Sequence, residues 1–154
     1  GRPDMALFKF TKAILEGRPI DVYNYGEMTR DFTYIDDLIS AIRLLMDIIP
    51  LQSDDKAESR ETIDSNSLVA PFRLVNIGNS QPEELGDFIY ALEKALGIEA
   101  KKNFMPMQPG DMPTTWADTS LLERLTGYRQ KTTIETGVGR FVDWYRHYYS
   151  IKVC

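Results

Sequence analysis

The sequence is poor in the two residue types that most often bind metals or form disulfides. Its 154 residues include one cysteine, Cys154, and one histidine, His147. A single cysteine cannot form a disulfide within the chain, and it excludes a zinc site built from several cysteines. His147 lies in an aromatic-rich helical pattern, where a structural role is the more frequent one. The lone cysteine fits a reducing compartment, so we expect a cytoplasmic protein.

Positive charge and long apolar runs are also scarce. The chain has 18 Lys and Arg against 23 Asp and Glu, which gives a net charge of −5. Nucleic acids are bound by basic surfaces, so we expect no nucleic-acid partner. No stretch approaches the roughly 20 apolar residues that span a bilayer, so we expect no membrane partner. A hydrophobic content of 43% is ordinary for a soluble globular domain.

The sequence lacks a glycine-rich loop for a dinucleotide. No G-x-x-G-x-x-G run is present, and Gly137 and Gly139 lie inside a helical pattern without a third glycine. Tyr90 and Lys94 have the Y-x-x-x-K spacing of an acid/base pair that works beside a nicotinamide. Because they lie in an ordinary amphipathic helix pattern, we interpret them as surface residues. We therefore expect no catalytic, cofactor-binding or metal-binding residue in this chain.

Hydrophobic spacing predicts an α/β fold with about five short strands and five helices. The predicted helices cover 4–16, 35–49, a segment capped by Ser80 and Glu83 and closed by Gly97, a segment from Asp118 to Gly127, and a last one capped by Thr132 and Glu135. The predicted strands cover 20–23, a run that Arg30 and Asp31 open and that continues through 32–35, 72–77 and 100–107. Residues 51–70 are polar and predict a loop, and Gln108–Asp111 predict a turn.

The run from Thr29 to Asp37 is the most informative one. Arg30 and Asp31 open a β-prone run, and two further acids then start a helical pattern. This places a guanidinium at a strand edge beside a helix N-terminus. Both features favour an anion, because the guanidinium fork and the helix dipole attract negative charge.

Four segments together resemble one branch of the extended short-chain dehydrogenase/reductase family, the UDP-glucuronate 4-epimerases. They are G-R-P-D-M-A at 1–6, R-D-F-T-Y-I-D-D at 30–37, Q-P-G-D-M-P with T-W-A-D-T at 108–119, and F-V-D-W-Y-R at 141–146. The resemblance implies that residues 1–154 are the carboxy-terminal, nucleotide-sugar-binding domain. It also implies that the NAD-binding Rossmann half is missing, and that NAD is bound by that half.

The resemblance implies an activity for the full-length protein. That activity is the interconversion of UDP-glucuronate and UDP-galacturonate through a 4-keto intermediate, in polysaccharide biosynthesis. A UDP-glucuronate decarboxylase, a dTDP-glucose dehydratase relative and a non-catalytic nucleotide-sugar-binding module remain alternatives. We expect a UDP-sugar as partner, a homodimer for the full-length enzyme, and self-association of this chain through the strand at 72–77.

Three residues receive roles at the nucleotide from the resemblance. Arg30 is expected to bind the diphosphate, and its alternative is a surface ion pair with Asp31 or Asp36. Asp111 is expected to bind the ribose hydroxyls, and its alternative is a turn aspartate that bonds its own backbone. Gln108 is expected to donate to a phosphate without charge, so its contribution is the smaller one.

The resemblance also implies contacts at the two ends of the ligand. Asp21, Val22 and Tyr23 correspond to a strand beside the nucleobase, with plain strand packing an equal alternative for Tyr23. Arg2 is the candidate clamp for the carboxylate of a uronic acid. Its alternative is an exposed residue without a role in binding.

Overall fold

The computed structural model describes residues 3–50, 65–67 and 69–151. Arg2 and most of the predicted loop at 51–70 lie outside the described residues. The chain divides into two compact units. The first contains residues 1–30, 82–115 and 132–154, and the second contains residues 31–81 and 116–131.

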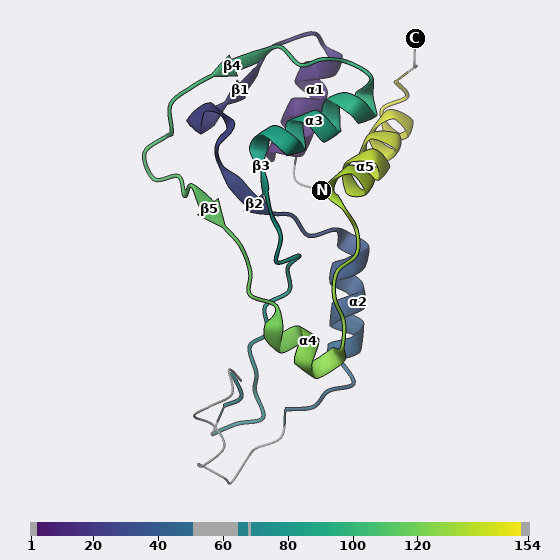
Figure 1. The fold of residues 1–154 in the computed structure, drawn as a ribbon. Helices are drawn as coiled ribbons and strands as arrows, with labels where there is room; N and C mark the ends of the chain where they lie inside the picture. The colour runs from purple at the N-terminus through teal and green to yellow at the C-terminus, as the bar shows by residue number, and fades with distance from the viewer. Residues whose placement is uncertain (1–2, 51–64, 68, 152–154) are drawn as a thin grey trace. The chain divides into compact units, whose positions relative to one another are not determined.

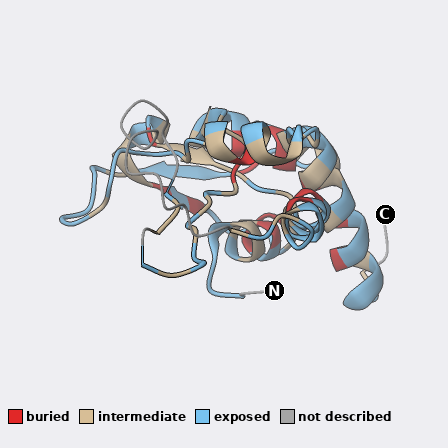
Figure 2. Cartoon of the chain, turned by 90° about the horizontal axis from the view of Figure 1, so that it is seen from below, coloured by how far each residue is buried: buried red, intermediate tan, exposed pale blue. Residues whose placement is uncertain are grey.

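Three amphipathic helices form the core of the first unit. They are α1 (Ala6–Leu15), α3 (Leu85–Leu96) and α5 (Ile134–Tyr148). The helix α3 packs along α5, and α1 packs against α3 (Figure 1). Phe88 and Leu92 of α3, and Val138 and Val142 of α5, are almost fully buried. The two residues of each pair are four positions apart, so each pair lies on one face of its helix. Figure 2 shows the buried residues as short red patches on the helices, beside exposed pale-blue turns.

Aromatic rings fill the space between α1 and α5. The ring of Phe8 lies edge-on to Phe141 at a centroid distance of 4.9 Å, and edge-on to Trp144 at 5.9 Å. Tyr145 is buried, whereas Phe141 is only half-buried. Edge-to-face pairs of this kind stabilise a core beyond the area that they bury.

Two small sheets, one of two strands and one of three, complete the first unit. In one sheet β1 (Ile20–Val22) pairs with β4 (Lys102–Phe104). In the other, β2 (Thr29–Asp31) lies between β3 (Pro82–Glu84) and β5 (Thr114–Thr115) (Figure 1). A short 3₁₀ segment, η1 (Tyr23–Gly26), connects β1 to β2. With five α-helices and five strands among the described residues, the predicted α/β class is confirmed.

The predicted strand that Arg30 opens is formed, but its predicted extension through residues 32–35 is wrong. The strand β2 ends at Asp31, and Ile35 is already the first residue of α2 (Ile35–Leu45). The hydrogen-bonding partner decides this, because β5 lies beside Thr29 and Arg30 rather than beside the more β-prone residues that follow.

Both predicted capping boxes are also wrong. Ser80 has a left-handed φ of 54°, and β3 separates it from α3, which begins at Leu85. The last helix is capped by Thr133, whose Oγ1 accepts a hydrogen bond from the Thr136 backbone N–H at 3.3 Å. The predicted cap, Thr132, therefore lies one residue too early.

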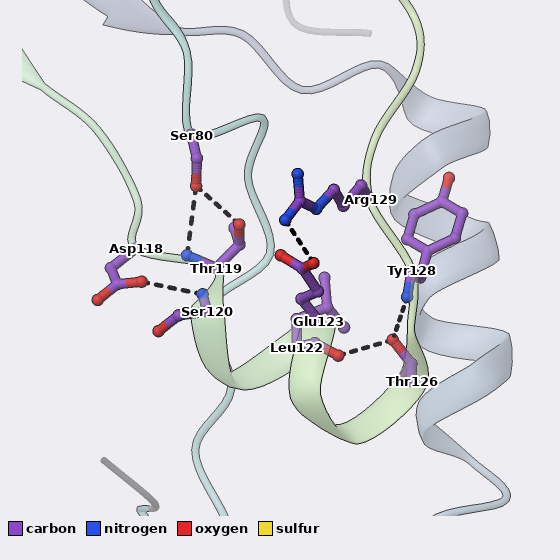
Figure 3. A network of polar contacts seen from close by, with 9 residues as sticks. All are labelled: Ser80, Asp118, Thr119, Ser120, Leu122, Glu123, Thr126, Tyr128 and Arg129. Atoms are coloured by element: carbon purple, nitrogen blue, oxygen red, sulfur yellow. Dashed lines mark hydrogen bonds and ion pairs between the residues drawn. The ribbon is translucent and has the colours of Figure 1, made fainter. Parts of the chain in front are cut away.

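The second unit contains two helices that pack against each other, α2 and α4 (Ser120–Thr126). Asp118 Oδ1 accepts a hydrogen bond from the Ser120 backbone N–H at 2.9 Å, at the start of α4 (Figure 3). This bond is the main cause that lowers the pKa of Asp118. Gly127, with a φ of 68°, ends α4 as predicted.

The Tyr128 phenol connects the segment after α4 to the buried side chain of Asp37 in α2. Its hydroxyl donates to Asp37 Oδ1 at 2.8 Å. Burial raises the pKa of Tyr128, and the bond to Asp37 raises it further. The contact satisfies a carboxylate that is only 7% exposed.

The predicted strand at 72–77 is not formed in the structure. Within the described residues its only ladder contact is one antiparallel bridge between Arg73 and Asn66. The segment still alternates between exposed and less exposed residues, and Phe72 and Leu74 are 54% and 66% exposed. A strand needs a hydrogen-bonding neighbour along its length, and a single bridge does not provide one.

Candidate functional site

Residues 20–30 and residues 102–115 of the first unit run side by side, and together they carry most of the predicted site residues. The strand pair β1–β4 aligns Val22 with Phe104, and the pair β2–β5 aligns Arg30 with Thr115. Between these pairs, the Met105 backbone N–H donates to the Val22 carbonyl at 2.9 Å. Because both pairs are parallel, the loop after β1 and the loop after β4 leave the sheet at the same end.

Arg30 reaches from β2 to the segment that precedes β5. Its Nη1 donates to its neighbour's carbonyl, Thr29 O, at 2.8 Å, and to Pro113 O at 3.3 Å. Both acceptors are neutral carbonyl oxygens, whereas the carboxylate of Asp31 accepts hydrogen bonds from backbone amides. The guanidinium is thus held beside Pro113, which follows Asp111 by two residues in the sequence. Neither of these bonds neutralises its charge.

Gln108 and Asp111 are the two ends of a tight turn, as predicted. The Asp111 backbone N–H donates to Gln108 O at 3.1 Å, and Gly110 has a φ of 92°. Proline at the second position and a left-handed glycine at the third are typical of a type II turn. The turn fixes the backbone through the amide of Asp111. Gln108 is exposed and Asp111 is half-buried.

The three residues predicted beside the nucleobase lie in different environments. Asp21 Oδ1 accepts a hydrogen bond from Asn103 Nδ2 at 2.9 Å, so this side chain links β1 to β4. The Val22 side chain is 1% exposed, so it packs in the core and leaves only backbone groups for a ligand. Tyr23 is half-buried at the start of η1.

The sequence indicates a turn between β1 and β2, around Gly26, but it does not show the backbone strain that this loop carries. Asn24 and Tyr25 both adopt left-handed backbone conformations, with φ of 47° and 53°, and Gly26 follows at 92°. Two consecutive non-glycine residues in this region are costly, and such strain is concentrated at functional sites. Tyr25 is 60% exposed, and its backbone N–H donates to Met105 O at 3.1 Å. Asn and Gly indicate the turn, but no pattern in the sequence marks Tyr25.

The remaining predictions concern surface residues and absences. Tyr90 and Lys94 lie on the exposed face of α3, as expected for surface residues, and His147 is exposed on α5. No cluster of three metal-ligating side chains occurs among the described residues. Within the same residues, no helix is both long and apolar enough to span a bilayer.

These strands and helices define an α/β protein in which strand β2 carries an arginine and the turn before β5 carries an amide and a carboxylate. The first 52 residues match the NAD dependent epimerase/dehydratase family. This match agrees with the resemblance that the sequence motifs carry, and that resemblance is confirmed.

Individual proteins support the same conclusion. The chain is 56% identical over 154 residues to an uncharacterized 37.6 kDa protein of Escherichia coli O111:H-, covering 98% of the chain and 45% of that protein. It is 52% identical over 149 residues to a probable UDP-glucuronate 4-epimerase of Rhizobium meliloti, covering 97% of the chain and 43% of that protein. The fold matches the UDP-glucuronic acid 4-epimerase of Bacillus cereus, solved with UDP-glucuronic acid and NAD. That match has a TM-score of 0.74 and 32% identity, and it covers 96% of this chain and 41% of that one.

The chain thus spans less than half the length of these proteins. The family name includes NAD, but the residues present do not fit this cofactor. The 154-residue sequence has no glycine-rich loop that admits the pyrophosphate of a dinucleotide.

Proposed function

We propose that this chain binds the UDP-sugar in a protein that interconverts UDP-glucuronate and UDP-galacturonate through a 4-keto intermediate. The observation that carries the proposal is the hydrogen bond from Arg30 to Pro113 O. It joins the arginine of β2 to the segment that contains Gln108 and Asp111. One ligand that follows the two parallel segments can therefore meet all three side chains.

Each side chain suits one part of a UDP group. The guanidinium of Arg30 can donate to diphosphate oxygens through the N–H groups that the two carbonyls do not occupy. The carboxylate of Asp111 can accept hydrogen bonds from both ribose hydroxyls. Gln108 can donate to a phosphate through its side-chain amide, without a charge. The nucleobase is proposed to lie along Asp21–Tyr23, where Val22 offers backbone groups only.

Arg2 is proposed to select the uronic acid. The 4-keto form of a uronic acid is a β-keto acid, which loses CO₂ when the breaking C–C bond aligns with the carbonyl π system. A bidentate arginine on the carboxylate holds this bond out of alignment and favours the acid over an uncharged sugar. NAD is proposed to be held by residues other than these 154, because the glycine-rich loop is absent from them.

The setting of the protein is part of the proposal. A cytoplasmic location agrees with a single cysteine. Synthesis of a surface polysaccharide is the proposed use of the product, and a homodimer is the proposed state of the intact enzyme.

Calorimetry tests the binding role directly. The chain should bind UDP and UDP-glucuronate and should not bind NAD. A chain that binds neither UDP nor UDP-glucuronate, although its circular dichroism shows a folded state, would contradict the proposal. For the intact protein, product analysis by NMR should show UDP-galacturonate without release of CO₂. Release of CO₂ would indicate a decarboxylase instead.

A further inference from the structure

A cavity lies between α1 and the carboxy-terminal end of α5, within the first unit. Its volume is about 570 Å³, and small-molecule sites typically measure about 300–1,000 Å³. Helix α1 and its cap line one side with Phe8, Lys9, Lys12 and Glu16, and the end of α5 lines the other with Tyr145 and Tyr149. None of these residues has a role in the proposed function. We call this space the α1–α5 cavity.

The backbone at the end of α5 brings a further apolar side chain to the cavity. Ser150 has a left-handed φ of 53°. Its N–H donates to His147 O at 3.2 Å, and the Ile151 N–H donates to Arg146 O at 2.9 Å. These two bonds are those of a Schellman motif, which ends a helix and turns the chain back on it. Ile151 therefore lines the α1–α5 cavity instead of continuing away from the helix.

Aromatic rings form much of the wall. The ring of Tyr145 lies edge-on to Phe8 at a centroid distance of 6.1 Å, and its centroid is 4.5 Å from that of Tyr149. Rings packed in this way present both faces and edges to a neighbour, and aromatic pairs gain energy beyond the area that they bury. A planar aromatic ligand can therefore extend the group of three rings.

One polar atom of this wall has no protein partner. The side chain of Tyr145 is only 6% exposed, yet its hydroxyl forms no hydrogen bond with any described residue. Burial raises the pKa of Tyr145, and the nearby Tyr149 and Glu16 raise it further. The hydroxyl therefore keeps its proton at neutral pH and can donate it to an acceptor. A buried hydroxyl without a partner is costly, so an acceptor inside the cavity would be favoured.

The charges around the α1–α5 cavity favour an anion. The one carboxylate among its lining residues, that of Glu16, accepts a hydrogen bond from Arg18 Nε at 2.7 Å. It also lies 4.0 Å from Lys12 Nζ. The Lys9 ammonium forms no ion pair with any residue that the structure describes. The negative charge of the wall is thus already paired, and positive charge remains for a ligand.

We propose that the α1–α5 cavity binds a small aromatic carboxylate. The ring of this ligand lies against Phe8, Tyr145 and Tyr149. Its carboxylate accepts a hydrogen bond from the Tyr145 hydroxyl and is attracted by the ammonium groups of Lys9 and Lys12. A neutral aromatic molecule meets the same walls but gains nothing from the lysines. The inference is independent of the proposed function, because it involves no part of a UDP-sugar.

The test titrates two matched probes into the intact protein, with dissociation constants from ligand-observed NMR. 2-Naphthoate carries the charge, and 2-naphthamide is its neutral counterpart of nearly the same shape. 2-Naphthoate should bind with a dissociation constant of about 1 mM or lower, as its size allows. 2-Naphthamide should bind at least about threefold more weakly, because it lacks the attraction to the lysines.

Two variants assign the binding to the α1–α5 cavity. Tyr145→Phe keeps the ring and removes the hydroxyl, so it should weaken 2-naphthoate by about five- to tenfold. Tyr148→Phe is the matched control, because Tyr148 is 65% exposed on the same helix, and it should change the affinity by less than about 1.5-fold. Lys9→Met should weaken 2-naphthoate by about two- to fivefold and leave 2-naphthamide unchanged.

Circular dichroism establishes that each variant is folded. If Tyr145→Phe does not fold, the exposed Lys9→Met variant decides through its different effects on the two probes. The inference is overturned if 2-naphthoate does not bind the wild-type protein or if 2-naphthamide binds equally well. It is also overturned if Tyr145→Phe weakens 2-naphthoate no more than Tyr148→Phe does, or if Lys9→Met changes both probes by the same factor.

Discussion

Arg30 Nη1 lies 3.3 Å from the carbonyl oxygen of Pro113, although 83 residues separate them in the sequence. The contact is possible because β2 and β5 are parallel neighbours, with Arg30 aligned to Thr115. It brings the guanidinium to the segment that also carries Asp111. An arginine and an aspartate from distant motifs therefore serve one ligand in the proposed function.

Arg30→Ala should lower the affinity of the intact protein for UDP by about 10- to 100-fold, because hydrogen bonds to charged groups are worth about 1.5–3 kcal/mol. Arg30→Lys should recover part of this loss, since it restores the charge without the planar fork. Calorimetry with UDP measures both values. Arg18→Ala is the matched control, because Arg18 is an exposed arginine of the same unit that pairs with Glu16. An unchanged dissociation constant in Arg30→Ala would show that Arg30 does not bind the diphosphate.

Arg2→His should weaken binding of UDP-glucuronate by about tenfold or more and change binding of UDP-glucose by less than about threefold. The reason is that only the uronic acid offers a carboxylate to a bidentate guanidinium. Competition binding with both sugars in the intact protein measures the ratio. Equal losses for the two sugars would contradict a carboxylate clamp at this position.

Local sequence signals located much of the fold. The glycines at the ends of α3 and α4, Gly97 and Gly127, adopt the left-handed conformation that their positions indicate. The Pro-Gly pair in Gln108–Asp111 specified its turn for the same reason. These features depend on neighbouring residues only, so a single sequence carries them.

Features that depend on distant partners were the ones missed. β-Propensity favoured 32–35, but β5 lies beside Thr29 and Arg30. The segment 72–77 has a strand-like pattern and no paired neighbour within the described residues apart from the Arg73 bridge. Asp31 belonged to a recognised motif, yet the amides that it binds lie 48 to 86 residues away. No local pattern specifies such pairings, because tertiary contacts decide them.

Tyr128→Phe should lower the free energy of unfolding by about 1 kcal/mol, because the bond to the buried carboxylate of Asp37 is lost. The folded-state pKa of Tyr128 is raised above its ordinary value of 10.0. Its stabilising contribution is therefore fully present below pH 10 and is lost as the pH rises through the folded-state pKa. Urea unfolding from pH 8 to 11 should show the difference between wild type and variant shrinking above pH 10.

The control for this pH dependence is Tyr90→Phe, since Tyr90 is 64% exposed on α3. It should change stability by less than about 0.5 kcal/mol at every pH. A difference between wild type and Tyr128→Phe that stays constant across the pH range would exclude the linkage to Tyr128.

Ile39→Glu should reduce self-association of this chain. The apolar stripe of α2 faces solvent, with Ile35 and Ile39 each 55% exposed and Ile42 42% exposed. In the same unit, Phe72 and Leu74 are also exposed. Exposed apolar surface of this kind favours association, so the average mass of the wild-type chain should rise with concentration in sedimentation velocity. A glutamate in the stripe would have to lose its water in any contact between two chains, and this cost weakens the association. Met5→Glu adds the same charge at a residue 51% exposed in the other unit, and it should leave the association unchanged. A wild-type chain that stays monomeric at high concentration, or equal effects of the two substitutions, would show that the stripe does not cause association.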